Sequence, residues 1–395
     1  MPNLMTQFPS PPEEQVTLAN WRTAPFSSWA FHHVREIVAS ADVANDPANV
    51  WTMEEDLIDL SSLSIDGKSL DQVCKETKND GLVILHKGKL VYETYDHGMD
   101  AFTPHILMSV SKSVLGLLGG ILVGKGILKT DVLLTDYIPE LENTAWKGAT
   151  VREALDMRVG ILFDEDYLVT SGPIIDYRKA TNWNPLEPGD EATDLRSFFL
   201  TLTEPDGPHS GKFHYVSPNT DLLAWVYERA AGQRYADILC EHLWKPLGAE
   251  RSAYFTVDRF GAPRAAGGVC CTTRDLARLG QLLIQGGSRD GREIIPKTWI
   301  DDITLNGDPE AWQQGDFAEF YPGVDAHYRS KCYVFRGEEP MIFGLGIHGQ
   351  NVFADLKNEI VIAKHSSQAL PIDDQANDLT MKMVDVVRTF LKDRG

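Results

Sequence analysis

The most continuous hydrophobic stretch of the chain lies at residues 114–122, where apolar residues predominate on every side of a helical projection. Such a pattern predicts a buried helix, and Gly124 and Gly126 mark its end. The helix entrance would hold Ser109, beside exposed N–H groups and the positive end of the helix dipole.

Period-two patterns occur towards both ends of the chain. Two β-rich runs surround the turn at 86–89 and predict a hairpin over residues 81–95. An apolar stripe over residues 379–390 predicts a final helix packed on a sheet. Further short strands are expected at 332–335, 343–347, 351–353 and 360–363.

Helical patterns fill most of the chain between these regions. Thr150 with Glu153 has the spacing of a capping box, and Thr272 with Asp275 has the spacing of a helix cap. Apolar residues at helical spacing predict further helices at 29–38, 194–202 and 218–231.

Strands near both ends with helices between them predict an α/β fold. We expect one α/β domain made of residues 18–100 and 300–395, which encloses a mainly helical domain at 101–299. Residues 1–17 are rich in proline and polar residues and are expected to form an N-terminal arm. The active site would lie between the two domains.

The amino-acid composition argues against some classes of binding partner. The chain of 395 residues carries 37 basic and 57 acidic residues, a formal charge of −20 that is dispersed along the sequence. This charge argues against nucleic acid and anionic membranes as partners. The five cysteines lack metal-type spacing, and neither a signal peptide nor a membrane span is visible. The cytoplasm is therefore the expected location.

A Ser-x-x-Lys motif at the helix entrance is the main candidate for chemistry. Ser109 and Lys112 are three residues apart and would share one helical face, so a lysine made neutral by burial could accept the serine proton. The motif is expected by chance about once in a chain of this length. The alternative is that Ser111 and Ser113 are only small residues at a helix start.

Tyr215 and Ile347 are candidates to complete the site. Tyr215 lies where a loop becomes a helix and could pass the serine proton to a leaving group. Alternatively, Tyr215 packs under that helix and Ser217 caps it. The strand at 343–351 is rich in glycine, and the N–H of Ile347 could join that of Ser109 as an oxyanion hole. The alternative for this strand is that its glycines accommodate helix packing.

Ser-x-x-Lys, Tyr-x-Ser and a glycine-rich strand, in this order, resemble the motifs of the penicillin-recognising serine hydrolases. That family includes class C β-lactamases, D-alanyl peptidases and family VIII esterases, and the segments at 107–113, 164–167, 215–221 and 346–351 look most like its nylon-oligomer amidases. The resemblance implies a β-lactamase-like fold with a central antiparallel sheet. It also implies that Ser109 is the nucleophile, Lys112 its base, Tyr215 the proton shuttle and Tyr167 a residue that closes over the substrate.

The chain departs from β-lactamases in the glycine-rich strand. That strand lacks the lysine of their Lys-Thr-Gly motif, so β-lactam turnover is expected to be inefficient. His348 could partly substitute for that lysine, or could be a structural hydrogen-bonding residue. Asp176 and Ala266 are expected to line the substrate pocket, with Asp176 as the candidate to meet an ammonium group.

The resulting hypothesis is a serine hydrolase, a carboxylesterase or linear amidase, acting on a small ester or amide through an acyl-enzyme. No cofactor and no metal are expected, because His32-His33 and Asp164/Asp166 lack further ligands at metal spacing. Whether the protein forms a homodimer is left open by the sequence. The alternative class is a non-catalytic protein of the same fold that binds an acyl compound or assembles with partners, and the intact Ser109, Lys112 and Tyr215 favour the enzyme.

Overall fold

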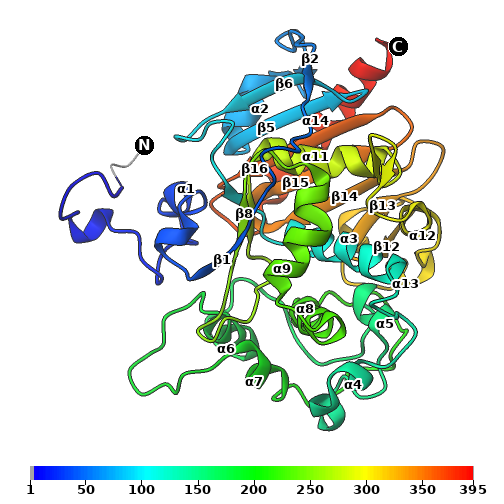
Figure 1. The fold of residues 1–395 in the computed structure, drawn as a ribbon. Helices are drawn as coiled ribbons and strands as arrows, with labels where there is room; N and C mark the ends of the chain where they lie inside the picture. The colour runs from blue at the N-terminus through cyan, green and yellow to red at the C-terminus, as the bar shows by residue number, and fades with distance from the viewer. Residues whose placement is uncertain (1–3, 395) are drawn as a thin grey trace.

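An eight-stranded sheet organises the computed structural model, which describes residues 4–394 (Figure 1). The strand order is β12-β13-β14-β15-β16-β5-β6-β2, and every neighbouring pair is antiparallel except β6 and β2. The strands are β2 (Glu54–Glu55), β5 (Asn79–His86), β6 (Lys89–Tyr95), β12 (Ala326–Arg329), β13 (Cys332–Phe335), β14 (Met341–Gly346), β15 (Gln350–Asp355) and β16 (Ile360–Ser366). Because β16 pairs with β5, the expected α/β fold with a sheet built from both ends of the chain is confirmed.

Helices cover both faces of this sheet. On one face, α11 (Thr273–Ile284) packs against β15, β16 and β5, and Gly280 permits the close approach because a Cβ there would meet Val361. On the other face lie α2 (Leu70–Glu76) and α14 (Asp374–Lys392), whose buried residues join one apolar cluster. Thr272 caps α11 by accepting a hydrogen bond from the Asp275 N–H, as its spacing predicts.

Most of the remaining helices gather beyond one end of the sheet, around α3 (Val110–Gly124) (Figure 1). Residues 110–122 of α3 are all buried, as its apolar sequence predicts. A Cβ at Gly119 would meet Tyr227, and one at Gly120 would meet Trp299. The other helices are α4 (Leu134–Tyr137), α5 (Val151–Leu155), α6 (Pro173–Ala180), α7 (Leu195–Phe199), α8 (Pro218–Ala231), α9 (Tyr235–Leu239), α10 (Lys245–Leu247), α12 (Lys297–Leu305) and α13 (Pro309–Gln313).

A second sheet, of four strands, was not expected from the sequence. Its order is β1-β8-β9-β7, and its strands are β1 (Ser40–Val43), β7 (His105–Ile106), β8 (Ala253–Thr256) and β9 (Val269–Cys271). Runs of two to four residues are too short to show a period, and β1 pairs with a strand about two hundred residues away. Residues 101–299 therefore contain strands as well as helices. Two short pairs complete the strands, β3 (Ser64–Ile65) with β4 (Lys68–Ser69) and β10 (Ser288–Arg289) with β11 (Arg292–Glu293).

The single helix expected at residues 29–38 is wrong. The chain forms α1 (Ser27–Ala30) and then a separate 3-10 turn at Val34–Glu36. The carbonyl of Phe31, which a continuous helix would use internally, accepts the N–H of Ile106 in β7 instead. Pairing with a distant strand thus ends this helix.

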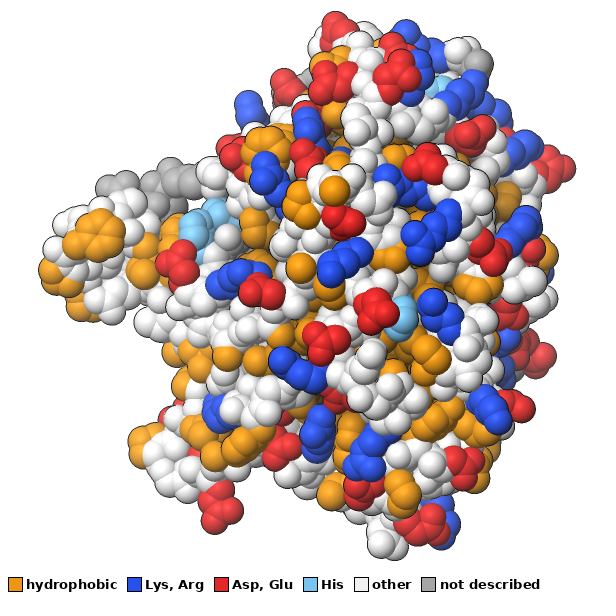
Figure 2. Space-filling model, in the orientation of Figure 1, with side chains coloured by type: hydrophobic (Ala, Val, Ile, Leu, Met, Phe, Trp, Pro, Cys, Tyr) orange, Lys and Arg blue, Asp and Glu red, His pale blue; other side chains and the backbone are white. Residues whose placement is uncertain are grey.

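Acidic and basic side chains alternate over the visible face of the molecule (Figure 2). No single-sign patch dominates that face, in agreement with a dispersed acidic excess. Among residues 4–394, no helix is long and apolar enough to cross a bilayer.

Candidate active site

Ser109 stands immediately before α3, and Lys112 lies one helical turn further on. The Nζ of Lys112 is 2.8 Å from the Oγ of Ser109 and 2.9 Å from the carbonyl oxygen of Ala266. The lysine is 1% exposed. Three-residue spacing on one helix therefore brings the hydroxyl and the amine into hydrogen-bond contact, as the sequence predicts.

Burial makes Lys112 a stronger proton acceptor than an exposed lysine at neutral pH. Loss of hydration lowers the pKa of its amine to about 7, while the nearby carboxylates of Glu165 and Asp221 oppose that shift and Arg264 adds to it. A substantial fraction of the amine is then unprotonated near pH 7. An unprotonated amine in contact with a serine hydroxyl can remove its proton.

Tyr215 completes this group from the loop before α8. The Ser109 and Tyr333 side chains are near enough to its hydroxyl to influence the pKa of the phenol, and its ring centroid lies 4.8 Å from the Nζ of Lys112. Burial and the charge of Glu165 raise the pKa of the phenol above its ordinary value, so it stays a proton donor. The carboxylate of Asp316 accepts the Tyr215 N–H at 2.8 Å and fixes this loop.

The oxyanion-hole candidates are the N–H groups of Ser109 and Ile347. β14 ends at Gly346 beside the backbone of Ser109, and a Cβ on Gly346 would stand 2.6 Å from the carbonyl oxygen of Leu107 and 3.1 Å from the Ser109 nitrogen. Only glycine allows this approach, which brings Ile347 to line the same cavity as Ser109. Within residues 4–394, neither the Ser109 nor the Ile347 N–H takes part in the backbone hydrogen bonds of turns, loops and caps.

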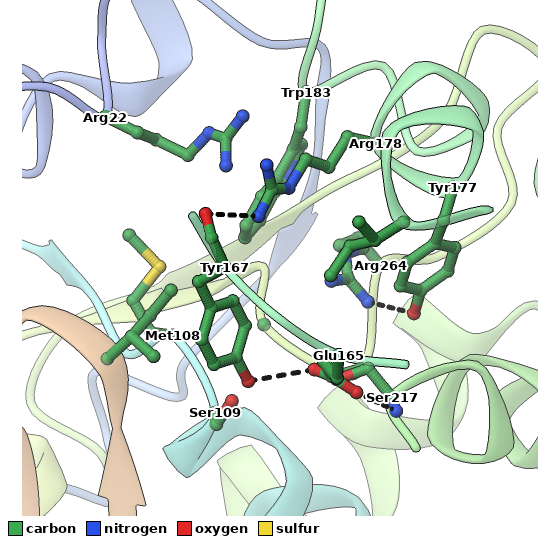
Figure 3. Close-up of a pocket in the computed structure, with 14 residues that line it drawn as sticks. Arg22, Met108, Ser109, Glu165, Tyr167, Tyr177, Arg178, Trp183, Ser217 and Arg264 are labelled. Carbon is green, nitrogen blue, oxygen red and sulfur yellow. Dashed lines mark hydrogen bonds between the residues drawn. The ribbon is translucent and has the colours of Figure 1, made fainter. Parts of the chain in front are cut away.

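Ser109 opens into a small cavity of about 30 Å³ (Figure 3). A second cavity of about 680 Å³ reaches Tyr215, and Glu165 and Tyr167 line both. The lining of the smaller cavity is Arg22, Met108, Ser109, Glu165, Tyr167, Ile174, Tyr177, Arg178, Trp183, Ser217, Arg264, Ala266, Gly267 and Ile347.

Glu165 connects three parts of the site and was not singled out from the sequence. Its carboxylate accepts the Ser217 N–H at 2.6 Å, the Ser217 hydroxyl and the Tyr167 hydroxyl at 2.9 Å. Ser217 therefore does not cap α8 with its side chain. The only sequence signal for Glu165 was its place in the acidic segment before Tyr167.

A buried ion pair holds the loop that carries Ala266. The carboxylate of Asp221, on α8, accepts from Arg264 at 2.5 Å, from the Ala266 N–H at 2.7 Å and from the Tyr177 hydroxyl at 2.5 Å. The Ala266 carbonyl in turn contacts the Lys112 amine. This network fixes the backbone oxygen that orients the amine.

The four residues expected to bind substrate divide into two groups. Tyr167 and Ala266 line the small cavity, as expected. Asp176 does not: it is exposed on α6, because the inward face of that helix is formed by Ile174, Tyr177 and, in part, Arg178.

His348 also lies outside both cavities. It is 2% exposed, and its Nδ1 lies 2.7 Å from the Gln368 carbonyl oxygen. Burial lowers the pKa of its imidazole to about 4. A φ of 62° turns the chain at this point, so His348 has the structural role left open by the sequence.

Arg22 is a further cavity residue that was missed, whereas Arg178 belongs to the segment at 164–180 that the sequence predicts along the pocket. Arg22 belongs to the segment after the N-terminal arm and Arg178 to α6, and both reach the cavity next to Ser109 (Figure 3). Positions this far apart in the chain gave no motif. Among residues 4–394, no group of three or more His, Cys, Asp and Glu side chains could hold a metal ion.

Comparisons with known proteins agree with this architecture. Residues 73–382 match the Beta-lactamase family. The chain is 34% identical over 362 residues to a 6-aminohexanoate-dimer hydrolase of Paenarthrobacter ureafaciens, and the match covers 91% of this chain and 90% of that protein.

Solved structures show the same likeness. A Bacillus anthracis protein, provisionally assigned as a 6-aminohexanoate-dimer hydrolase, has a TM-score of 0.87 at 26% identity, covering 97% of this chain and 99% of that one. A family VIII carboxylesterase has a TM-score of 0.58 at 16% identity, covering 80% of this chain and 95% of that one. At 16% identity the likeness is one of fold alone.

Proposed function

Since this chain belongs to the Beta-lactamase family and is a serine hydrolase of that fold, we propose that it cleaves small esters or linear amides through an acyl-enzyme on Ser109. The resemblance to penicillin-recognising serine hydrolases, the β-lactamase-like fold and the assignment as an enzyme are confirmed by the comparisons. The observation that carries the proposal is the hydrogen bond of 2.8 Å between the Ser109 hydroxyl and the Lys112 amine, with the Tyr215 ring centroid 4.8 Å from that amine.

In the proposed first step, Lys112 takes the Ser109 proton as the serine oxygen bonds to the substrate carbonyl carbon. The N–H groups of Ser109 and Ile347 stabilise the negative oxygen that results. The bond to the leaving group then breaks, the leaving group takes the Tyr215 proton, and Tyr215 regains a proton from Lys112. The acyl group is now bonded to Ser109.

In the second step, water attacks the acyl-enzyme carbonyl. Lys112 takes a proton from the water, and the Ser109 oxygen leaves and is reprotonated. The products are a carboxylic acid and the free alcohol or amine. Every proton released in one half-reaction is used in the same turnover.

The substrate class rests on the chemistry of the site and on the relatives. The name of the Paenarthrobacter relative identifies a linear amide as its substrate. An ester has a better leaving group and demands less of Tyr215 as proton donor. We therefore propose that short acyl esters are cleaved more readily than linear amides.

The experiment combines active-site labelling with an ester assay. A fluorophosphonate probe should label wild-type protein at Ser109, and 4-nitrophenyl butyrate should be hydrolysed. Ser109→Ala should lose both. Ser113→Ala, on the same helix but with its hydroxyl bonded to the Lys331 carbonyl, is the matched control and should keep both. A folded wild-type protein that neither labels at Ser109 nor hydrolyses the ester would refute the proposal.

A further inference from the structure

The cavity next to Ser109 is lined by three arginines, of which only Arg264 forms an ion pair with a carboxylate within residues 4–394. Arg264 is paired with the buried Asp221 at 2.5 Å. Arg22 and Arg178 approach from opposite sides, and Figure 3 shows their guanidinium groups pointing towards one another above Tyr167. The unpaired charges therefore meet over the cavity.

Neutral groups are the only hydrogen-bond partners of these two side chains within residues 4–394. Arg22 donates to the side-chain oxygen of Asn184, and its Nε is buried without a partner. The guanidinium of Arg22 also lies 5.6 Å from the ring of Trp21 and 5.7 Å from that of Trp183. Arg178 donates to the Tyr167 carbonyl at 3.0 Å. Most of their donors are thus free to bind a further acceptor.

Glu165, the one carboxylate that lines this cavity, is already engaged. It accepts hydrogen bonds from the Ser217 N–H, the Ser217 hydroxyl and the Tyr167 hydroxyl. Burial, with repulsion from Arg178 and Arg264, lowers the pKa of Arg22 to about 9. An anion between Arg22 and Arg178 would relieve that repulsion.

The position of this cavity decides which part of a substrate it would hold. Ser109 and Ile347, which face the carbonyl carbon and its oxygen in the proposed reaction, line the small cavity. Tyr215, the proposed donor to the leaving group, lines the large one. The acyl part of the substrate would therefore extend towards the arginines and the leaving group towards the large cavity.

We propose that Arg22 and Arg178 form a subsite for a carboxylate at the far end of the acyl group, so that the preferred substrates are monoesters or monoamides of dicarboxylic acids. This proposal rests on the proposed function. Two guanidinium groups can each bind one or both oxygens of a carboxylate. A bound carboxylate would also replace the Tyr167 carbonyl as the acceptor for Arg178, which would let the Tyr167 segment move aside for an acyl chain larger than the cavity.

The test compares two esters with the same six-carbon acyl chain, mono-4-nitrophenyl adipate and 4-nitrophenyl hexanoate. For wild-type protein we expect kcat/KM of the charged ester to exceed that of the neutral ester by at least about tenfold, the usual strength of a hydrogen bond to a charged group. In Arg178→Gln and in Arg22→Gln this ratio should fall by at least about tenfold.

Lys179→Gln is the matched control. Lys179 is the neighbour of Arg178 on α6, carries the same charge and pairs with Asp190 at 2.6 Å, outside the cavity. In Lys179→Gln, the ratio of kcat/KM for the adipate ester to kcat/KM for the hexanoate ester should equal the wild-type ratio. A control that lowers the ratio as much as Arg178→Gln would refute a local subsite.

A second measurement needs no variant. Adipamate, which is anionic, and hexanamide, which is neutral, are tested as competitive inhibitors of hexanoate ester hydrolysis by wild-type protein. We expect an inhibition constant at least about tenfold lower for adipamate. Equal constants, or equal kcat/KM for the two esters, would refute the subsite while the Ser109-dependent hydrolysis still supported the proposed function. No hydrolysis of either ester and no labelling of Ser109 would refute both.

Discussion

The two cavities that meet at Glu165 and Tyr167 differ in size and in the charge of their walls. The cavity next to Ser109 has a volume of about 30 Å³ and holds three arginines. The cavity next to Tyr215 has a volume of about 680 Å³, with exposed apolar side chains and an acidic rim. Its acidic residues are Asp164, Glu165, Asp166, Asp206, Asp316 and Glu319.

This contrast indicates how the enzyme would orient a substrate. An acyl group with a negative end fits the arginine side, and an apolar leaving group without a negative charge fits the acidic side. The scissile bond would lie at the boundary, where Ser109 contacts Lys112 and the Tyr215 ring lies beside that lysine. The following predictions test that boundary first and then each cavity.

The largest loss of activity should come from removing the Lys112 amine, at the boundary between the two cavities. Lys112→Ala should lower kcat/KM for 4-nitrophenyl butyrate by at least about a thousandfold, because the nucleophile and its base act as one unit. Thermal unfolding of this variant should still be cooperative, since alanine favours the helix. Lys125→Ala, at the end of the same helix, is the control and should retain activity. More than about a hundredth of the wild-type rate in Lys112→Ala would place the base elsewhere.

Removing the proton donor on the large-cavity side should separate amides from esters. Tyr215→Phe should lower amide hydrolysis by about a hundredfold or more, as general acid catalysis predicts. The loss for 4-nitrophenyl esters should be smaller, because nitrophenolate leaves without protonation. Rates for a matched anilide and 4-nitrophenyl ester of one acid measure this difference. Equal losses on both substrates would assign Tyr215 a role in the attack of Ser109 instead.

The 6-aminohexanoate dimer has its charges the wrong way round for these two cavities. Its ammonium is on the acyl side and would face the arginines, and its carboxylate is on the leaving-group side and would face the acidic residues of the large cavity. We expect kcat/KM for short acyl esters to exceed that for the dimer by at least about tenfold, which is about 1.4 kcal/mol of transition-state stabilisation. The exposed position of Asp176 strengthens this expectation, because Asp176 cannot offer the ammonium a partner in the cavity. Comparable values would show that the acyl side accepts a cation.

The pH dependence should report the burial of Lys112. A base with a pKa of about 7 is protonated and inactive below that pH, so kcat/KM should fall about tenfold per unit as the pH decreases below 7. Above the pKa the rate should reach a plateau, well before the ordinary pKa of lysine at about 10.4. The rate profile of the wild type from pH 5 to 10 tests this. A rise that continued to pH 10 would mean that the base is not a buried lysine.

The smallest effect concerns the apolar wall of the large cavity. Phe320 lines that cavity and is 49% exposed, so Phe320→Ala should remove apolar contact with a long leaving group. We expect the preference for hexyl over methyl esters to fall by about fourfold, because burial of one methylene group is worth about 0.8 kcal/mol. Phe260→Ala, exposed outside both cavities, should leave the preference unchanged. An unchanged ratio in Phe320→Ala would place the leaving group elsewhere.

Local patterns predicted a large part of the fold. The hairpin at 81–95, the buried α3, the caps at Thr150 and Thr272 and the late strands all form where the sequence indicates them. Each depends on residues that are neighbours along the chain. The division into two domains stays a prediction.

Predictions failed where distant segments compete for the same backbone groups. The strands β8 and β9 and the early end of α1 depend on pairing with segments far away in the sequence. Short runs of this kind carry no period of their own.

The sequence by itself determined the chemistry of the site. Ser109 and Lys112 meet because three residues along a helix is a contact distance, whatever surrounds the helix. The place of Tyr215 beside them was expected only from the resemblance to the family. Only the tertiary structure decided the charge of the cavity. Arg22, Arg178 and Glu165 come from separate segments, and α6 turns Arg178 inward while Asp176 faces solvent. Neighbouring residues on a helix point in different directions, so which one reaches the cavity depends on how the helix packs against the rest of the chain.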